Sequence, residues 1–535
     1  MHRLVILSLA LSLGNVAAPA TAADTLPQRI DALIDARAKG KPISPPADDG
    51  EFLRRVTLDL AGTIPTAEET RRFLADSSPD KRDKRIDDLL KRPGYARRMA
   101  DVFHVQLMER LGDHSEWQRY LESAFGENRP WDQIVREILQ GQPSEGRRGA
   151  AFFLAKRLEN FGQNPVDYPG LARDVGRLFL GRDLRCAQCH DHLFVKEYKQ
   201  ADFQGLFLFV QNAYLVDGPR MMVGEKPLAE KASFQSVFGK VRQQTGPRVP
   251  GRKEVSIPKW TKAEEYLVPA DPRAKKPGVL RFSPLAALAR EVPDSPDFAR
   301  NFVNRLWWML MGRGLVHPLD LHHADNPPSH PELLALLSQE FREHRYDIRW
   351  MIGQMMRTRV YQRSSLLPEG ASPGPPGLFL TGIEKRLSAE QILAATLQAT
   401  GMRPELEQMP KDAGKATPLE QMRQRMLKAY AAQPREPEDE VVPALQGALF
   451  LLNDSTFLTW FAPRSSNLAA RLDKLDSLQA LADELYLNVV TRLPSPVERD
   501  EVRATLAGRS GTDRQRRIGQ LIWALVASTE FSVNH

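Results

Sequence analysis

Apolar residues recur along most of the chain at the three- and four-residue spacing of an α-helix that buries one face. This periodicity predicts helices over 52–60, 85–90, 131–139, 171–180, 286–310, 331–343, 348–356, 387–400, 477–490 and 514–527. Strict alternation of apolar and polar residues, which would indicate strands, is confined to short pieces. The predicted fold is therefore mainly α, built from multi-helix domains.

One segment breaks the helical pattern. From 217 to 277 proline, glycine and lysine accumulate, and short alternating pieces such as 252–258 predict a few edge strands. We interpret this segment as an irregular or β-containing insertion between helical domains at 23–216 and 278–535. Its basic residues offer a surface for an acidic partner, although a solvated linker is the simpler interpretation: Lys226, Lys231, Arg248, Arg252, Lys253, Lys275 and Lys276.

Two stretches near the ends of the chain resemble each other. In each, a proline is followed by a capping box, Thr66 with Glu69 and Ser495 with Glu498, and then by a basic amphipathic helix, at 82–90 and 514–525. The pattern predicts a helix, turn, helix, helix unit that occurs twice. We expect these residues to be structural and assign none of them to a site.

The first 22 residues have the features of a cleaved signal peptide. A basic start, Met1-His2-Arg3, precedes an apolar stretch at 4–13 that is too short to span a bilayer, and Ala20-Thr21-Ala22 is typical of a cleavage site before Ala23. No later stretch is long and apolar enough to be a membrane helix. We therefore expect a periplasmic or otherwise extracytoplasmic protein without a transmembrane segment.

The composition excludes only a few classes of function. The net charge is +7, but 74 basic residues are interleaved with 67 acidic ones, which is typical of solvated helix faces. We expect no nucleic-acid partner, and an anionic polysaccharide stays open as an extracytoplasmic partner. The chain has no Gly-x-Ser-x-Gly sequence, Walker loop or His-Glu-x-x-His sequence, so it shows no signature of the enzymes that use them.

The two cysteines of the chain both lie in Cys186-Ala187-Gln188-Cys189-His190. This spacing is that of a covalent haem c site, in which both thiols form thioethers with the porphyrin and the histidine ligates the iron. Export supports it, because haem c is attached outside the cytoplasm. The hypothesis is a haem-c protein that transfers electrons to a redox partner or oxidises an extracytoplasmic substrate.

Two alternatives stay open for the cysteines. A Cys186–Cys189 disulfide would staple a loop of a non-enzymatic binding or scaffold protein. A zinc site would use both thiols with His190 or His192, but the chain has no second ligand pair of the usual spacing.

Other histidines and methionines are further candidate ligands. The sixth position of a haem iron has as candidates Met221, Met222, His104, His114 and His330. The segment 317–330 carries four histidines with Asp320 and Asp325, a mixture that could bind a metal or supply an acid and a base. A capping box of Ser329 with Glu332 explains much of this segment, which leaves His330 as the candidate metal ligand.

Several stretches resemble known domains. The sequence at 52–66 and the stretch from Leu180 through Cys186 to Phe194 are similar to the planctomycete cytochrome-like domain DUF1549, or PSCyt2. The second half resembles its usual partner, DUF1553 or PSD1, in Asn304-Arg305-Leu306-Trp307 and at 312–316, 326–334 and 530–535. The resemblance implies an exported protein of a family without an assigned function, whose cytochrome label rests on the same Cys-x-x-Cys-His sequence.

The chain departs from this resemblance at two places. Leu193 stands where relatives often have proline, and Leu321-His322-His323 replaces a stretch that is commonly acidic and aromatic. The resemblance therefore implies no role for His322 or His323. His330 does fall on the matching pattern.

Overall fold

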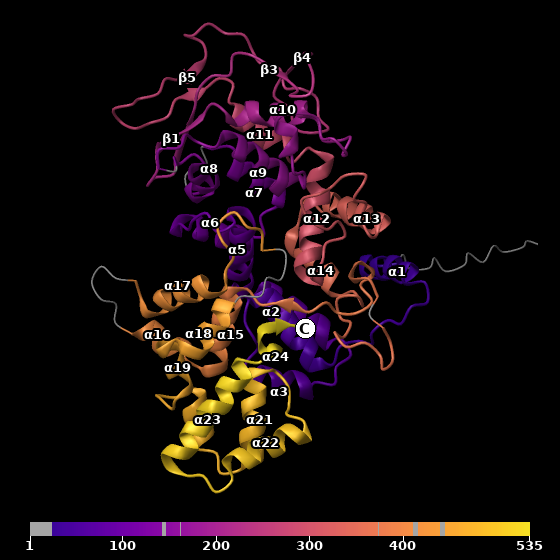
Figure 1. Ribbon diagram of the computed structural model, residues 1–535, viewed down its shortest axis with the longest axis vertical. Coiled ribbons are helices and arrows are strands. Elements are labelled where there is room, and N and C mark those ends of the chain that lie inside the picture. The colour runs from indigo at the N-terminus through magenta and orange to yellow at the C-terminus, as the bar shows by residue number, and fades with distance from the viewer. Residues whose placement is uncertain (1–23, 142–145, 161, 373, 410–415, 439–444) are drawn as a thin grey trace, which may run out of the picture.

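The computed structural model describes residues 24–141, 146–160, 162–372, 374–409, 416–438 and 445–535. The predicted signal peptide at 1–22 lies outside the described residues. The described chain consists mainly of helices with short two-stranded antiparallel sheets (Figure 1), so the predicted fold class is confirmed. No described helix combines the length and the apolar character needed to cross a membrane.

A first hydrophobic core extends from Leu26 to Phe379. Ten helices of the N-terminal half build most of it: α1 (Leu26–Ala38), α2 (Asp49–Ala61), α3 (Ala67–Ala75), α4 (Lys81–Lys91), α5 (Pro93–Met108), α6 (Ser115–Gly126), α7 (Trp131–Leu139), α8 (Phe152–Arg157), α9 (Tyr168–Leu180) and α10 (Gln200–Val210). Four later helices complete it: α11 (Pro284–Glu291), α12 (Pro296–Met311), α13 (Pro331–Glu343) and α14 (Ile348–Met356). Trp131 of α7 stacks on Phe302 of α12 with ring centroids 4.3 Å apart, which joins the early and late helices.

The stretch 286–310 was predicted as one helix, and this prediction is wrong. It forms two helices, α11 and α12, which are separated by a turn that holds Pro293. Ser295 caps α12 by accepting a hydrogen bond from the Asp297 backbone, and Pro296 occupies its first turn. A proline in the helix interior would remove a backbone donor, so the chain ends one helix and caps the next.

A second core holds the C-terminal helices, drawn in orange and yellow in Figure 1. They are α15 (Ala389–Thr400), α16 (Arg403–Gln408), α17 (Pro418–Tyr430), α18 (Leu445–Asn453), α19 (Ser455–Leu458), α20 (Leu468–Asp473), α21 (Leu478–Val489), α22 (Pro496–Leu506), α23 (Gly511–Val526) and α24 (Thr529–Ser532). Leu58 and Ile64 of the N-terminal half are also part of this core. The chain end therefore packs against the α2–α3 region.

The predicted repeat is confirmed as two three-helix units, α2–α3–α4 and α21–α22–α23, and both capping boxes form. The units contact each other through α3 and α21. The fully buried Arg54 of α2 also donates to the backbone carbonyls of Phe531 at 2.8 Å and Glu530 at 3.2 Å. These bonds fix the C-terminal segment against the first repeat unit.

The insertion holds three short hairpins. β1 (Ala213–Asp217) pairs with β2 (Met222–Glu225), β3 (Ala232–Gln235) with β4 (Arg242–Thr245), and β5 (Tyr266–Val268) with β6 (Val279–Leu280). The segment 252–258, predicted as an edge strand, is irregular, so that prediction is wrong. Its Val255 amide bonds to the carbonyl of Pro247 instead of joining a ladder, and Pro258 lacks a donor.

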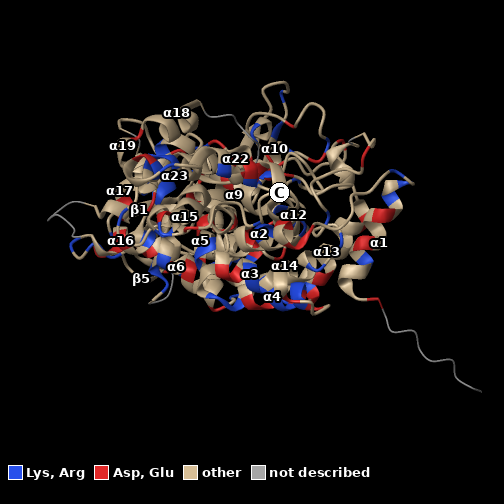
Figure 2. Cartoon of the chain, turned by 90° about the horizontal axis from the view of Figure 1, so that it is seen from below, with Lys and Arg blue, Asp and Glu red and all other residues tan. Residues whose placement is uncertain are grey.

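Several basic residues of the insertion are paired with carboxylates. Lys231 bonds Glu254 at 2.6 Å, Arg248 bonds Asp202 at 2.9 Å, and Arg252 bonds Glu291 at 3.0 Å. The same interleaving of charge continues on the helices seen in Figure 2, where basic and acidic residues alternate along α1, α3 and α4. These ion pairs leave the insertion with less free positive charge than its composition suggests.

Candidate functional site

The Cys-x-x-Cys-His sequence lies in the loop between α9 and α10. Cys186 begins a single 3-10 turn, Cys186–Gln188, which the Cys189 amide closes on the Cys186 carbonyl at 3.4 Å. Arg173 of α9 holds the turn by donating to the Gln188 side chain at 2.6 Å. Both thiols are free and exposed, so the structure places them on one turn without joining them in a disulfide.

The His190 ring is oriented by its neighbours. Its Nδ1 lies 2.6 Å from the Asp191 carbonyl oxygen, which places the proton on Nδ1 and leaves the Nε2 lone pair available. The ring also packs against Phe238, with centroids 4.7 Å apart. A backbone carbonyl on one ring nitrogen is the usual support of a histidine that ligates a metal through the other.

Large apolar side chains next to the motif face solvent. Leu193 and Phe194 follow the motif and are 65% and 80% exposed, and Val237 and Phe238 in the β3–β4 loop are 66% and 71% exposed. The Val237 amide donates to the Cys189 carbonyl at 3.1 Å, which holds this loop against the motif. Apolar groups of this size are usually buried, and together they mark a binding surface.

These residues fit a covalently bound haem. Two free thiols lie one turn apart, an imidazole beside them has an available Nε2, and apolar side chains are present to cover a porphyrin. Cys186, Cys189 and His190 are thus brought together as the sequence predicts.

His192 has a structural task. Its Nδ1 accepts hydrogen bonds from the backbone amides of Phe194 at 3.2 Å and Val195 at 2.9 Å, which fixes the loop after the motif. Across the described ranges, no group of three or more His, Cys, Asp or Glu side chains is arranged to hold a metal ion. The zinc alternative gains no support from this arrangement.

Three of the predicted sixth ligands have other contacts in the structure. His104 is buried and accepts a hydrogen bond from the Trp117 indole at 3.0 Å, while His114 caps α6 by accepting from the Glu116 amide at 3.2 Å. Met221 packs in the first core, next to Met222 at the start of β2. In the described chain, none of them has a hydrogen bond or ring contact with His190.

Among the described residues, the histidines of 317–330 form no group that could hold a metal ion. His322 is buried beneath Gly181, beside Asn304, and burial together with nearby Arg300 lowers its pKa to about 3. His330 is also buried, and burial lowers its pKa to about 4. Both are therefore neutral near pH 7.

The predicted capping box of Ser329 with Glu332 is wrong. The cap of α13 is His330, which makes no side-chain capping bond, and the Ser329 hydroxyl lies 3.1 Å from His330 Nδ1 instead. The His330 Nε2 is buried without a hydrogen-bond partner among the described residues. Its position is that of a core residue packed against Phe379.

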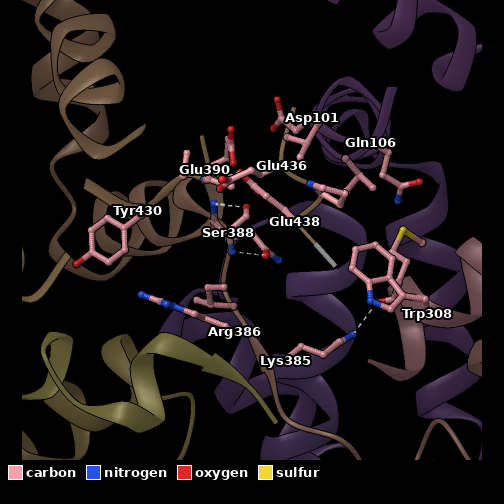
Figure 3. A pocket seen from close by; sticks show the side chains of 18 of the residues that line it. Asp101, Gln106, Trp308, Lys385, Arg386, Ser388, Glu390, Tyr430, Glu436 and Glu438 are labelled. Carbon is pink, nitrogen blue, oxygen red and sulfur yellow. Dashed lines mark hydrogen bonds between the residues drawn. The ribbon is translucent and has the colours of Figure 1, made fainter. Parts of the chain in front are cut away.

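A cavity of about 500 Å³ lies where the two cores meet (Figure 3). Its walls come from distant parts of the chain: Asp101 of α5, Trp308 of α12, Lys385 of β7 (Lys385–Arg386), Glu390 of α15 and Tyr430 of α17. β7 pairs with β8 (Val533–Asn534), so the chain end also borders the cavity. Sites at such junctions are common binding sites for small molecules.

Most charges of the cavity wall are paired. Arg110 bonds Glu390 at 2.5 Å, Arg177 bonds Glu109 at 2.6 Å, and Lys385 bonds Asp59. Each pair joins segments far apart in the sequence. These ion pairs hold the wall in place.

Two charged groups of the cavity wall have no such ion pair. Arg98 and Asp101 of α5 line the cavity, and neither has a hydrogen bond or an ion pair among the described residues; the Nε of Arg98 is buried without a partner. Burial and the nearby Glu390 raise the pKa of Asp101 to about 6. Sequence reasoning missed both residues, although a charged pair three residues apart on a helix that is otherwise largely buried was the available signal.

Helix α9 connects the motif to the cavity. Its Arg173 bonds Gln188 inside the motif, and its Arg177 bonds Asp320 at 3.0 Å in the cavity wall. Four residues of helix rise by about 6 Å, so these two arginines lie one turn apart. The two regions are therefore neighbours on one rigid element.

Comparison with known proteins gives family matches only. No curated protein and no solved structure matches the chain. Residues 29–214 match PSCyt2, a protein of unknown function (DUF1549), and residues 285–506 match PSD1, a protein of unknown function (DUF1553). The predicted resemblance and its order along the chain are confirmed. The chain thus carries a PSCyt2 (DUF1549) domain followed by a PSD1 (DUF1553) domain.

Proposed function

We propose that this protein is an extracytoplasmic haem-c protein in which Cys186 and Cys189 hold the porphyrin through thioether bonds and His190 ligates the iron. The observation that carries the proposal is the arrangement around the motif. Two free, exposed thiols lie on one turn, beside an imidazole whose Nε2 is available. A bound haem supplies one-electron chemistry at this position.

The surrounding residues have defined tasks in this proposal. The Asp191 carbonyl fixes the tautomer of His190 and increases the basicity of its free nitrogen. Asp191 itself is held because its carboxylate accepts from the Gln200 amide at 2.9 Å. Phe194 and Phe238 supply apolar surface that would exclude water from one part of the macrocycle.

The protein then acts in electron transfer or in the oxidation of an extracytoplasmic substrate. The cavity favours oxidation, because α9 places a ligand-sized space one helical turn from the contact that holds the motif. Export follows from the predicted signal peptide at 1–22.

Production in a host that exports the protein and attaches haem c tests the proposal. We expect an intact mass higher than that of the polypeptide by one haem, and a Soret band that persists after denaturation. The Cys186→Ser/Cys189→Ser variant should have the mass of the bare polypeptide, and His190→Ala should change the spectrum because the iron loses its proximal ligand.

His192→Asn is the matched control, because His192 lies two residues away and supports the loop rather than the haem. We expect it to retain the haem and its spectrum. A wild-type protein of unmodified mass, from cells that mature another c-type cytochrome in the same culture, would refute the proposal. A disulfide between the two cysteines in that product would favour the scaffold alternative.

A further inference from the structure

One basic and one acidic group, Arg98 and Asp101, line the cavity between the two cores. Their charges attract each other, but neither has a hydrogen bond or an ion pair among the described residues. Arg98 and Asp101 are three residues apart on α5, so they lie on the same face of that helix. We propose that this cavity is a binding site for a neutral, hydroxyl-rich ligand, a small saccharide, which bonds to both groups. This inference does not depend on haem attachment.

The lack of partners points to a ligand. A buried guanidinium or carboxyl group without a hydrogen bond is unfavourable, and native proteins pair nearly all such groups. The Arg98 Nε is buried and has no partner among the described residues, while the half-buried Asp101 lines the cavity and has no described hydrogen bond. Arg177, Arg305 and Lys385 of this wall are each held by a carboxylate, whereas Arg98 is a donor that is left for a bound molecule.

The charges of the cavity favour a neutral ligand. Arg98 and Asp101 together carry no net charge, and the described part of the wall, these two included, has eight acidic and five basic residues. An anion that bonded Arg98 would therefore face an excess of carboxylates, including Asp101 and Glu390. A cation that bonded Asp101 would face the guanidinium of Arg98.

Hydroxyl groups suit this pair because each can accept from a guanidinium and donate to a carboxylate. Two aromatic residues complete the site: Trp308 and Tyr430 lie on opposite sides of the cavity in Figure 3. The Tyr430 hydroxyl donates to the Gly447 carbonyl at 3.0 Å, which fixes that ring. Aromatic rings of this kind pack against the C–H faces of sugars, and a cavity of about 500 Å³ is in the range of small-molecule sites.

Calorimetric titration of the full-length protein with maltose, cellobiose, glucosamine and glucuronate tests the proposal. We expect at least one of the two neutral disaccharides to bind with a millimolar or lower Kd, more tightly than the cationic and anionic sugars. Arg98→Met and Asp101→Ala should each weaken that binding by about tenfold or more, because each removes a hydrogen bond to a charged group.

Arg97→Met is the matched control, since Arg97 is the exposed neighbour of Arg98 on the same helix, and it should bind like the wild type. Arg98→Lys, which retains a donor, separates loss of the hydrogen bond from loss of folding and should bind more tightly than Arg98→Met. The Cys186→Ser/Cys189→Ser variant should bind fully, so that a failure of haem attachment leaves this test intact.

Either of two results would overturn the inference. The first is the absence of binding by both neutral disaccharides at millimolar concentration, or tighter binding of a charged sugar. The second is binding that survives unchanged in a folded Arg98→Met protein, because the ligand would then lie elsewhere.

Discussion

Lys385→Met is expected to lower the free energy of unfolding by about 3–5 kcal/mol, as found when one partner of a buried ion pair is removed. The Lys385 ammonium lies 2.7 Å from one Asp59 carboxylate oxygen and 2.8 Å from the other, and it donates to the Leu310 carbonyl at 2.9 Å. Asp59 is only 3% exposed. Without the ammonium, the α2 carboxylate stays in the interior without its bonded cation, and Arg98, whose charge also acts on it, makes no hydrogen bond with it.

The remaining partners of Asp59 do not replace the lost charge. The Tyr361 hydroxyl donates to it at 2.9 Å and the Asn534 amide at 2.8 Å, but both donors are neutral. The same network also joins three parts of the molecule: α2, the segment after α14 and the C-terminal strand β8. We therefore expect the variant to loosen the C-terminal segment as well as to unfold at a lower urea concentration.

Urea unfolding followed by circular dichroism measures this effect. Asp59→Asn/Lys385→Met should be more stable than Lys385→Met alone, because it also removes the buried carboxylate that has lost its bonded cation. Lys84→Met is the control: its ion pair with Asp80 is exposed, so the change should stay within about 0.5 kcal/mol. A loss of less than about 1 kcal/mol in Lys385→Met would show that this pair does not hold the interface.

The helices could be predicted from the sequence because their signals are local. The ranges predicted for α7, α13 and α14 match the observed bounds, and both capping boxes of the repeat form. Each depends on residues within one or two turns of one another. The Cys186 to His190 turn is local in the same sense, and its use as a haem site stays a prediction.

The features that the sequence did not reveal depend on distant contacts. Glu390 lines the cavity and is held there by an ion pair with Arg110, which is far away in the chain. Similarly, α11–α14 lie within the match to PSD1 but complete the first hydrophobic core. Periodicity identifies the buried face of a helix but not the helix that covers it. Neither the cavity nor the packing of α11–α14 into the first core could therefore be predicted.

Asp101→Asn is expected to stabilise the protein at pH 7 and to have a much smaller effect at pH 4. Burial and the nearby Glu390 raise the pKa of Asp101 from 3.8 in the unfolded chain to about 6 in the folded protein. Between these two pH values the folded state binds more protons than the unfolded state, so the wild type loses stability as pH rises through this window. A shift of this size corresponds to at most about 3 kcal/mol at pH 7.

Asparagine has no charge at either pH, so the variant should lack this pH dependence. Urea unfolding of wild type and variant at pH 4 and pH 7 measures this dependence. The control is Asp80→Asn at the exposed N-cap position of α4, where the side chain makes no capping bond; it should change stability by no more than about 0.5 kcal/mol at both pH values. An equal effect of Asp101→Asn at pH 4 and pH 7 would contradict the prediction.

A substitution at Asp101 that stabilises the protein would indicate a binding site. Active and binding sites often retain groups that destabilise the free protein, because the same groups are satisfied when the ligand binds. If removal of the Asp101 charge stabilises the fold while removal of its side chain weakens saccharide binding, the position is retained for the ligand rather than for folding. The carboxylate of Asp101 then lowers the stability of the free protein and strengthens the binding of the ligand.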